Sequence, residues 1–264
     1  MKSKETWALV TGASGGIGAE IARELASKGV HLVLAARSED KLTELGKHLE
    51  HSFSIQCRIQ RTDLAQTGAP LELFQQVSDC PISILVNNAG FGYFGGFQTS
   101  DWSHYQNMIQ VNMASLSHLT YLFLPKFKEL NKPAYILNVG SVAGWQGVPN
   151  FAFYAATKAF VNAFSEGLAW ELEGSNVSLT CLQPGKTATG FFDASKVEEG
   201  HQEFTESGTM SAKEVAKQGV SAMFNKENST ITGVMNKLNV LSSRLAPRWV
   251  LKKTVSHIFR EFSE

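Results

Sequence analysis

The chain has 264 residues, of which 43% are hydrophobic, so it can bury the core of one sizeable domain. Its 24 basic and 24 acidic residues give a formal net charge of zero, which gives no support for nucleic-acid binding. No stretch reaches the roughly 18 consecutive apolar residues of a spanning helix, and no apolar leader precedes the first strand, so we expect a cytoplasmic protein. Three distant cysteines and seven scattered histidines form no ligand pattern, and we expect no metal site.

The first predicted elements are a strand, a glycine-rich turn and a helix. Residues 7–11 predict the strand, residues 12–18 read GASGGIG, and the apolar positions within 21–26 follow a helical pattern. Such a turn lets the backbone approach a pyrophosphate, which rests on the N–H groups and the positive dipole end of the helix. The alternative is an ordinary tight turn, but the flanking strand and helix favour a nucleotide site.

The end of the second predicted strand, residues 30–36, indicates which cofactor binds. About 20 residues past a glycine turn an acidic residue is expected to bind the ribose, but here Ala36 is followed by Arg37. A carboxylate would accept hydrogen bonds from the ribose 2′-hydroxyl, whereas a guanidinium pairs with a 2′-phosphate. The sequence therefore favours NADP over NAD. The alternative is that Arg37 is solvated and precedes a helix for which Ser38 is the N-cap.

The next segments predict a helix over residues 38–50 and a third strand over 52–59. Asp63 follows at the place where an adenine ring would lie, and its alternative role is a helix cap. Residues 82–86 predict a fully apolar fourth strand that ends in NNAG at 87–90. Small and amide residues there would let a cofactor pass close over the strand ends, although a simple turn is the alternative.

Residues 101–128 predict a helix that is apolar on nearly every face and is therefore buried on more than one side. One side would cover the sheet and the other would meet a partner subunit, so we expect a homodimer or homotetramer. Asn112 is a lone amide in the middle of this helix. One interpretation of Asn112 is a buried polar residue that bonds to its own backbone.

The segment from 138 to 158 offers a hydroxyl, a phenol and an ammonium that can converge. Residues 135–137 predict a strand, so Ser141 lies at its carboxyl end, and residues 153–170 predict a helix. Tyr154 and Lys158 are four apart, which puts them on one face of that helix. A nearby ammonium would lower the pKa of the phenol enough for acid/base work near neutral pH. The alternative is an ordinary helix pair.

The C-terminal third continues the alternation. Residues 177–183 predict a strand that ends at Pro184-Gly185, a substrate loop is expected over about 186–210, and residues 211–214 form a capping box. An amphipathic basic helix is predicted over about 247–262, with apolar residues in one stripe: Leu251, Val255, Ile258, Phe259 and Phe262. We favour docking of this helix on the domain or on a second subunit over peripheral membrane contact.

Strands that alternate with helices along the whole chain predict one α/β domain over residues 1–264, a Rossmann-type doubly wound parallel sheet with helices on both faces. Aromatic residues follow three predicted strand ends and should border one cleft, which suits a lipophilic substrate, although some of them could belong to the core. They are Phe91, Tyr93, Phe94, Phe97, Trp145, Phe151, Phe153, Phe191 and Phe192.

Six motifs together resemble the short-chain dehydrogenase/reductase family over about the first 190 residues: TGASGGIG at 11–18, NNAG at 87–90, Asn112, Ser141, YAATK at 154–158 and PG at 184–185. The resemblance implies that Tyr154 is the acid/base, that Lys158 lowers its pKa and binds the nicotinamide ribose, and that Ser141 holds the substrate oxygen. Asn112 would organise a water in the proton relay. The implied cofactor contacts, with Arg37 added, are Gly12, Ser14, Gly16, Ile17, Gly18, Asp63, Leu64, Asn88, Ala89, Gly90, Tyr154, Lys158, Pro184, Gly185, Thr187 and Thr189.

The resemblance implies hydride transfer between NADP, or less favourably NAD, and a carbonyl or alcohol, with Tyr154 as general acid/base. The fold does not fix the reaction, because the family also includes epimerases and proteins that no longer catalyse. Two alternatives therefore stay open: a nucleotide-sensing interaction protein whose site is a relic, and an epimerase or isomerase that uses the same site.

Overall fold

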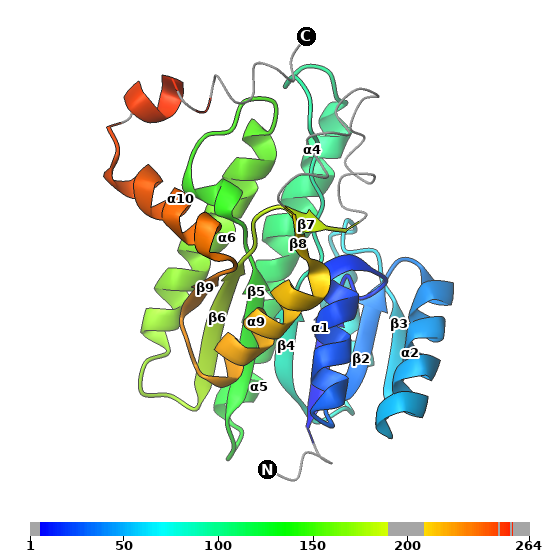
Figure 1. Ribbon diagram of the computed structural model, residues 1–264. Coiled ribbons are helices and arrows are strands. Elements are labelled where there is room, and N and C mark those ends of the chain that lie inside the picture. The colour runs from blue at the N-terminus through cyan, green and yellow to red at the C-terminus, as the bar shows by residue number, and fades with distance from the viewer. Residues whose placement is uncertain (1–5, 190–208, 248, 254, 256–264) are drawn as a thin grey trace.

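The computed structural model of the protein describes residues 6–189, 209–247, 249–253 and 255 (Figure 1). Its centre is a seven-stranded sheet in which every neighbouring pair of strands is parallel. In spatial order the strands are β3 (Cys57–Arg61), β2 (His31–Ala36), β1 (Trp7–Thr11), β4 (Ile82–Asn87), β5 (Ala134–Val139), β6 (Val177–Gln183) and β9 (Ser229–Ile231). The expected doubly wound parallel sheet is confirmed.

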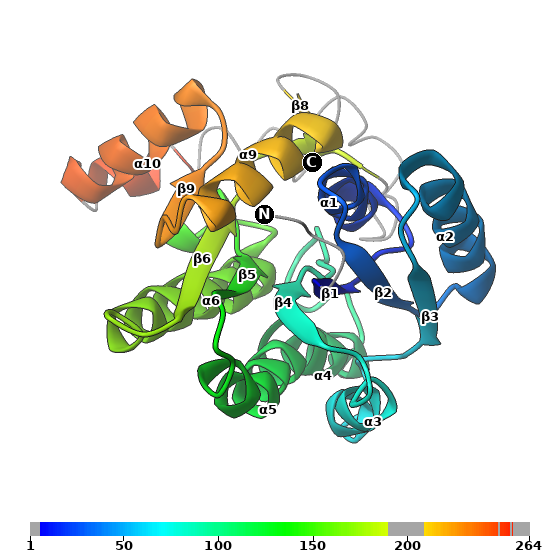
Figure 2. The same ribbon diagram turned by 90° about the horizontal axis from the view of Figure 1, so that it is seen from below.

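Helices cover both faces of this sheet, as Figure 2 shows along the layers. The α-helices are α1 (Gly16–Ser27), α2 (Glu39–Phe53), α3 (Ala69–Gln76), α4 (Trp102–Ile109), α5 (Leu116–Lys128), α6 (Ala152–Glu171), α9 (Ala212–Phe224) and α10 (Val234–Leu245). Helices α1, α2 and α9 share one hydrophobic core with the sheet, whereas α3, α5 and α6 share the core on the other face. The site therefore lies on a sheet that is packed from both sides.

The strand order has a switch point at β1: β2 and β3 lie on one side of β1, and the strands from β4 onward lie on the other. Strand β1 pairs with β2 on one side and with β4 on the other, so the chain winds outward in both directions from this point. In open α/β sheets, ligands bind outside the carboxyl ends of the strands at such a switch point. The glycine turn that follows β1 and the NNAG segment that follows β4 thus meet at the expected edge.

The junction between the second helix and the third strand differs most from the sequence-based expectation. The third strand begins at Cys57 rather than at residue 52, because α2 continues to Phe53. Ser54 then ends the helix in the left-handed conformation at φ 53°, with its N–H bonded to the carbonyl of Glu50. The apolar positions of α2 keep helical spacing up to Leu49, so periodicity alone did not mark the end.

The long helix expected over 101–128 is divided by a π-helical segment, η1 (Gln110–Ser115), which lies between α4 and α5. Asn112 lies in this segment. Such π-helical turns are rare and are frequent at functional sites.

Strand β9 forms the far edge of the sheet and α10 follows it in the chain; neither was among the predicted elements. None of the helices in the described ranges is long and apolar enough to cross a membrane. The C-terminal stripe is visible only in part: Leu251 and Val255 are described, whereas Ile258, Phe259 and Phe262 lie outside the described residues, as do Phe191 and Phe192.

Candidate active site

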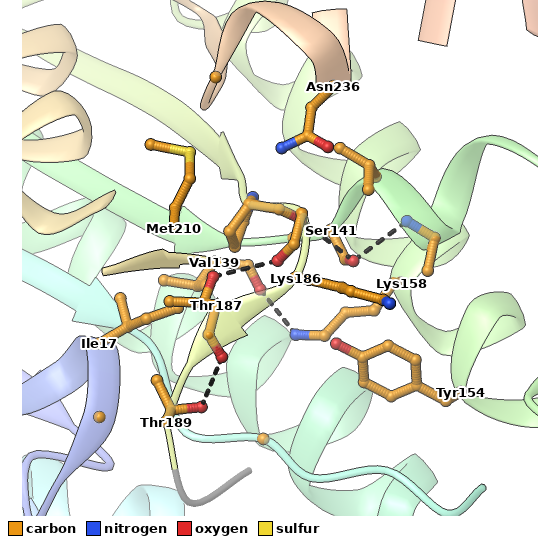
Figure 3. Close-up of a pocket in the computed structure, with 18 of the residues that line it drawn as sticks. Ile17, Val139, Ser141, Tyr154, Lys158, Lys186, Thr187, Thr189, Met210 and Asn236 are labelled. Carbon is orange, nitrogen blue, oxygen red and sulfur yellow. Dashed lines mark hydrogen bonds between the residues drawn. The ribbon is translucent and has the colours of Figure 1, made fainter. Parts of the chain in front are cut away.

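A cleft of about 950 Å³ opens at the carboxyl edge of the sheet. Its walls come from the glycine turn after β1, the ends of β4, β5 and β6, the start of α6, and helix α10. Figure 3 shows Ser141, Tyr154 and Lys158 facing this space, with Ile17 and Thr189 on one side of it and Asn236 of α10 on another. One cleft therefore joins the predicted nucleotide turn to the predicted acid/base group.

Ser141 occupies the end of β5 as expected, in extended backbone at φ −169°. It caps the short 3₁₀ helix η2 (Val142–Trp145), because its Oγ accepts a hydrogen bond from the N–H of Ala143 at 3.1 Å. The same hydroxyl donates to the carbonyl of Pro184 at 3.4 Å, and its interaction with the Tyr154 phenol lowers the pKa of that phenol. Ser141 is thus held by backbone groups of two segments, and Figure 3 shows its side chain on the same side of the cleft as Tyr154.

Tyr154 is in the first turn of α6 and is buried, with 7% of its surface exposed. Its ring stacks on Phe151, with 4.3 Å between centroids. Burial raises the pKa of the phenol above its ordinary value, and the hydrogen bond to Ser141 acts in the opposite direction. The packing leaves the ring little freedom to move, so the hydroxyl is held beside Ser141.

Lys158 lies one turn further along α6 and is also buried. Its ammonium donates a hydrogen bond to the carbonyl of Val139 at 2.7 Å and lies 5.8 Å from the centroid of the Tyr154 ring. Burial lowers the pKa of Lys158 from 10.5 to about 8.

The expected shift of the Tyr154 pKa was wrong in sign for this structure. Helical spacing does bring Lys158 and Tyr154 onto one face, as predicted, but the ammonium points to the backbone of β5. Burial opposes the charged form of both groups, and for Tyr154 it exceeds the effect of the hydrogen bond from Ser141. Attraction between the two charged forms would lower the pKa of the phenol, but removing both groups from water costs free energy that opposes their ionisation.

Asn112 is 1% exposed and connects two segments of the site. Its amide nitrogen donates to the carbonyl of Phe91 at 2.9 Å and to Oγ1 of Thr157 at 3.0 Å, and its oxygen accepts from the N–H of Phe91 at 3.1 Å. The interpretation that Asn112 bonds to its own backbone is therefore wrong. A side chain added at Gly90 would lie 3.1 Å from Asn112 Oδ1 and 3.4 Å from Lys158 Nζ, so these three residues adjoin.

The turn after β1 is shaped for a ligand that approaches the backbone. Gly12 has φ +65°, and an added Cβ would meet the Asn88 amide at 2.8 Å and Ala89 Cα at 2.9 Å. Thr11 Oγ1 accepts the N–H groups of Asn88 at 3.0 Å and of Ala89 at 3.1 Å, which holds the ends of β1 and β4 together. Gly18 packs so closely on the carbonyl of Gly12 that a side chain there would collide with it. These contacts bring the N-terminus of α1 up to the cleft, where it can hold a pyrophosphate.

The segment after β6 reaches back to this turn. Thr187 Oγ1 donates to the carbonyl of Gly185 at 3.0 Å, and a Cβ added at Gly16 would lie 3.2 Å from Thr189. Most of the predicted site residues therefore line one cleft, namely Gly12, Gly16, Ile17, Asn88, Ala89, Gly90, Ser141, Tyr154, Lys158, Pro184, Gly185, Thr187 and Thr189. The residues present fit a dinucleotide at this edge.

Six predicted residues lie outside the lining: Ser14, Gly18, Arg37, Asp63, Leu64 and Asn112. Arg37 is exposed just past the end of β2. Asp63 accepts the N–H of Ala65 at 3.1 Å, which is a local turn, and it does not cap α3, whose N-cap is Gly68. The carbonyl of Leu64 accepts the hydroxyl of Ser115 at 2.8 Å.

The structure adds residues that the sequence reasoning missed. Lys41 lines the cleft from the first turn of α2, and the nearness of a second cation to Arg37 in the sequence could have identified it. Helix α10 supplies a wall that includes Asn236, Asn239, Val240 and Ser243. The Arg244 guanidinium lies 4.0 Å from the centroid of the Trp145 ring, which ties α10 to η2, and the Trp145 indole donates to Gln183 at 2.8 Å, which ties η2 to β6.

The aromatic residues expected at the cleft divide into two groups. Trp145 and Phe151 line the cleft. Tyr93, Phe91 and Phe153 pack with Tyr105 in a cluster that adjoins the cleft through Tyr154 and Phe151, whereas Phe94 is buried and Phe97 is largely exposed. Among the residues that the structure describes, no group of three or more His, Cys, Asp or Glu side chains is placed to hold a metal.

Comparisons with known proteins agree with this geometry. The family model for short chain dehydrogenase matches residues 6–200. The chain is 32% identical over 183 residues to a 7beta-hydroxysteroid dehydrogenase of Clostridium sardiniense, which covers 69% of this chain and 70% of that protein. It is 30% identical over 257 residues to the very-long-chain 3-oxoacyl-CoA reductase of Rattus norvegicus, which covers 94% of this chain and 78% of that protein.

Two solved structures have the same fold over nearly the whole chain. A short-chain dehydrogenase from Sphingobium yanoikuyae in complex with NADPH matches with a TM-score of 0.81 and 28% identity, covering 94% of this chain and 95% of that chain. A short-chain dehydrogenase/reductase from Burkholderia phymatum in complex with NAD matches with a TM-score of 0.83 and 26% identity, covering 91% and 93%.

Proposed function

The chain belongs to the short-chain dehydrogenase/reductase family of oxidoreductases, and we propose that it uses NADP to interconvert a carbonyl and an alcohol on a lipophilic substrate. The observation that carries the proposal is the convergence of Ser141, Tyr154 and Lys158 on a cleft that also contains the glycine turn. The phenol and the hydroxyl that proton transfer requires both line the cleft that holds the glycine turn, which favours an enzyme over a nucleotide-sensing relic.

The cofactor, Tyr154 and Ser141 each have a separate part in the proposed reaction. When NADPH is bound, it supplies the hydride, which is the part of the chemistry that protein side chains cannot provide. Tyr154 gives its phenolic proton to the substrate oxygen during reduction and takes a proton back during oxidation. Ser141 holds the same oxygen, because its hydroxyl already contacts the phenol.

Lys158 and Asn112 support the proton transfer. The Lys158 ammonium is within the same buried space as Tyr154 and is oriented by Val139. Positive charge there stabilises a developing phenolate as Tyr154 loses its proton. Asn112 adjoins Gly90, which lies next to Lys158, and its proposed role is to order a water in the proton relay; both of its amide hydrogens are bonded to Phe91 and Thr157.

The preference for NADP rests on two cations near the end of β2. Arg37 is exposed directly after that strand, and Lys41 lines the cleft from the first turns of α2. A 2′-phosphate would be bound by a charge-assisted hydrogen bond to either cation, whereas a free 2′-hydroxyl would gain much less from them. The carboxylate that would bind that hydroxyl is absent at residues 36 and 37.

The proposal of a lipophilic substrate rests on the lining away from the glycine turn. Apolar side chains there come from η2, from the loop before α6 and from α10, namely Trp145, Val148, Phe151, Val234, Met235 and Val240. A pocket lined in this way binds substrates largely by apolar burial and orients them with a few polar groups. The names of the hydroxysteroid and 3-oxoacyl-CoA relatives support the same class of substrate.

The experiment that tests the function is a spectrophotometric screen of NADPH and NADH oxidation against ketones, aldehydes and acyl substrates of graded size, with Tyr154→Phe as the inactive control. We expect oxidation of NADPH with hydrophobic ketones and little with polar sugar ketones. Cofactor binding with no turnover across the panel would favour a sensing protein. Substrate conversion without net consumption of NADPH would favour an epimerase.

A further inference from the structure

Lys186 is a cation in the cleft for which the mechanism above has no use. It directly follows Pro184-Gly185, and its backbone is fixed on both sides. Its carbonyl accepts the N–H of Met210 at 3.0 Å where β7 (Thr187–Ala188) pairs with β8 (Met210–Ser211). On the other side, a side chain added at Gly185 would collide with the amide of Asn236.

The Lys186 side chain extends into the cleft rather than away from it. It is among the lining residues, and Figure 3 shows it crossing the cleft with its amino group on the side of Ser141, Tyr154 and Lys158, away from Ile17 and Thr189. Its position is therefore on the side of the acid/base group and not on the side of the glycine turn. A substrate whose carbonyl oxygen meets Ser141 and Tyr154 would pass close to this amino group.

The charges around the cleft have one sign. Of the lining residues in the described part of the chain, three are lysines, Lys41, Lys158 and Lys186, and none is aspartate or glutamate. Lys41 belongs to the nucleotide end and Lys158 to the acid/base group. Partial burial lowers the pKa of Lys186, which reflects a cost of holding its charge in this environment. An anion bound there would offset that cost.

We propose that Lys186 binds an anionic group, most simply a carboxylate, that the substrate carries close to its reacting carbonyl. The substrate class of the proposed reaction is then a lipophilic oxo acid or the matching hydroxy acid. The proposal rests on the proposed carbonyl–alcohol activity and narrows it. The apolar wall of Trp145, Val148 and Phe151 takes the body of such a molecule, and Lys186 fixes its acidic end.

The test compares one aryl oxo acid with its methyl ester, which has the same body and no charge. In Lys186→Met, the ratio of kcat/KM for the acid to that for the ester should fall on the order of tenfold to a hundredfold, as expected when a charge-assisted hydrogen bond is lost. The loss should lie mainly in KM, because the carboxylate is held equally in ground state and transition state. Lys186→Arg should retain most of the ratio.

Lys217→Met is the matched control, because Lys217 is exposed on α9 and does not line the cleft. In Lys217→Met, the ratio of kcat/KM for the acid to that for the ester should equal the ratio in the unchanged protein. An equal loss for acid and ester in Lys186→Met would overturn the proposal, as would a wild-type preference for the ester. Weakened NADPH binding in Lys186→Met, measured by cofactor fluorescence, would also overturn it, because Lys186 would then serve the cofactor.

Failure of the proposed function gives a different result. If no ketone or ester supports NADPH oxidation, the oxo acid is titrated calorimetrically into the protein–NADPH complex and into the same complex of Lys186→Met. Binding that depends on Lys186 without turnover would retain the carboxylate site and reject the oxidoreductase activity. Equal binding by both proteins, or none by either, would reject the carboxylate site.

Discussion

The ammonium of Lys158 donates a hydrogen bond to the carbonyl of Val139, across 2.7 Å between helix α6 and the end of strand β5. This bond satisfies a backbone oxygen at the edge of the sheet and fixes the direction of the lysine side chain. It does not remove the cost of burying the charge, since burial still lowers the pKa of Lys158 to about 8. The site therefore contains a cation whose burial opposes folding, at a position that we propose is catalytic.

This cost predicts how Lys158→Met changes stability with pH. In the unfolded chain a lysine has a pKa of about 10.4, so between pH 8 and that value the unfolded state binds more protons than the folded state. The free energy of unfolding of the unchanged protein therefore rises with pH in that window, because the cost of burying the charged lysine is gradually removed. Below pH 8 the lysine is charged in both states, and the full cost of burying it is present. Lys158→Met lacks the group.

The free energy of unfolding of Lys158→Met minus that of the unchanged protein should therefore be larger at pH 7 than at pH 9.5. Loss of the bond to Val139 lowers both values and does not change this comparison. Urea unfolding at the two pH values measures this difference. Lys217→Met, an exposed control, should show no such change. A relative stability that stays constant or grows with pH would contradict the buried-cation interpretation.

Tyr154→Phe should remove turnover and leave NADPH binding nearly intact. The ring keeps its packing on Phe151, and only the hydroxyl that contacts Ser141 is lost. We expect kcat to fall by about 10²-fold to 10⁴-fold, the usual contribution of a positioned acid/base group. Steady-state kinetics and a fluorescence titration of NADPH on the same variant check the two parts. Substantial residual kcat would remove Tyr154 from the proton transfer.

Cofactor choice should depend on Arg37 and Lys41 together. Arg37→Ala and Lys41→Ala should each weaken NADPH more than NADH, and the double variant should bring the two affinities close, because only the 2′-phosphate loses its partners. Lys47→Ala, an exposed lysine further along α2, is the matched control. Equal losses for NADPH and NADH in both single variants would assign these cations to structure.

The contact between Gly185 and Asn236 can be tested by a double-mutant cycle. A methyl group at Gly185 would overlap the Asn236 amide, which donates to the carbonyl of Thr232 at 2.7 Å. Gly185→Ala should destabilise the protein by about 1–3 kcal/mol, as overpacking does. Asn236→Ala should destabilise Gly185→Ala by less than it destabilises the unchanged protein, because it removes the side chain that the new methyl group overlaps. Simple additivity in urea unfolding would show that α10 adjusts freely.

The expected homo-oligomer has a specific surface to test. Tyr121 on α5 and Trp170 on α6 are 74% and 60% exposed, an unusual state for large aromatic side chains on two helices of one face. Tyr121→Asp combined with Trp170→Asp should lower the mass measured by light scattering if copies of the chain associate through this face. Leu238→Asp on the exposed side of α10 is the control for a surface elsewhere. An unchanged mass with the first pair and a reduced mass with the control would move the interface to α10.

Much of the fold was predictable because local rules agree along the chain. The first strand and the strand at 177–183 were predicted to the residue, since apolar runs end at turn residues. The cleft was predictable as well, because strand ends that carry small or polar residues must meet at one edge of a parallel sheet. The direction of the Lys158 side chain was not, because it depends on a carbonyl of β5 that no spacing on α6 reveals.

Helix α10 was not predicted for a related reason. Its apolar residues include five that are exposed, Val234, Met235, Leu238, Leu241 and Leu245, so its hydrophobic pattern does not mark a buried face. Its role comes from the residues that line the cleft, of which three are apolar and three are polar: Val234, Met235, Asn236, Asn239, Val240 and Ser243. Lys186 begins the segment expected to form the substrate loop, but it was not singled out, because a sequence does not show to which side of a cleft a side chain points.

The position of α10 affects how the substrate range of this protein can evolve. The nucleotide turn, the acid/base group and the strand ends are all built before residue 190, whereas one wall of the cleft is added by a helix beyond the last strand of the sheet. That wall is held by the stacking of Arg244 on Trp145 and by the fit of Asn236 over Gly185, and it contributes little to the shared core. Substitutions at the α10 residues that line the cleft can therefore change which substrates fit, while the residues proposed for hydride transfer stay unchanged.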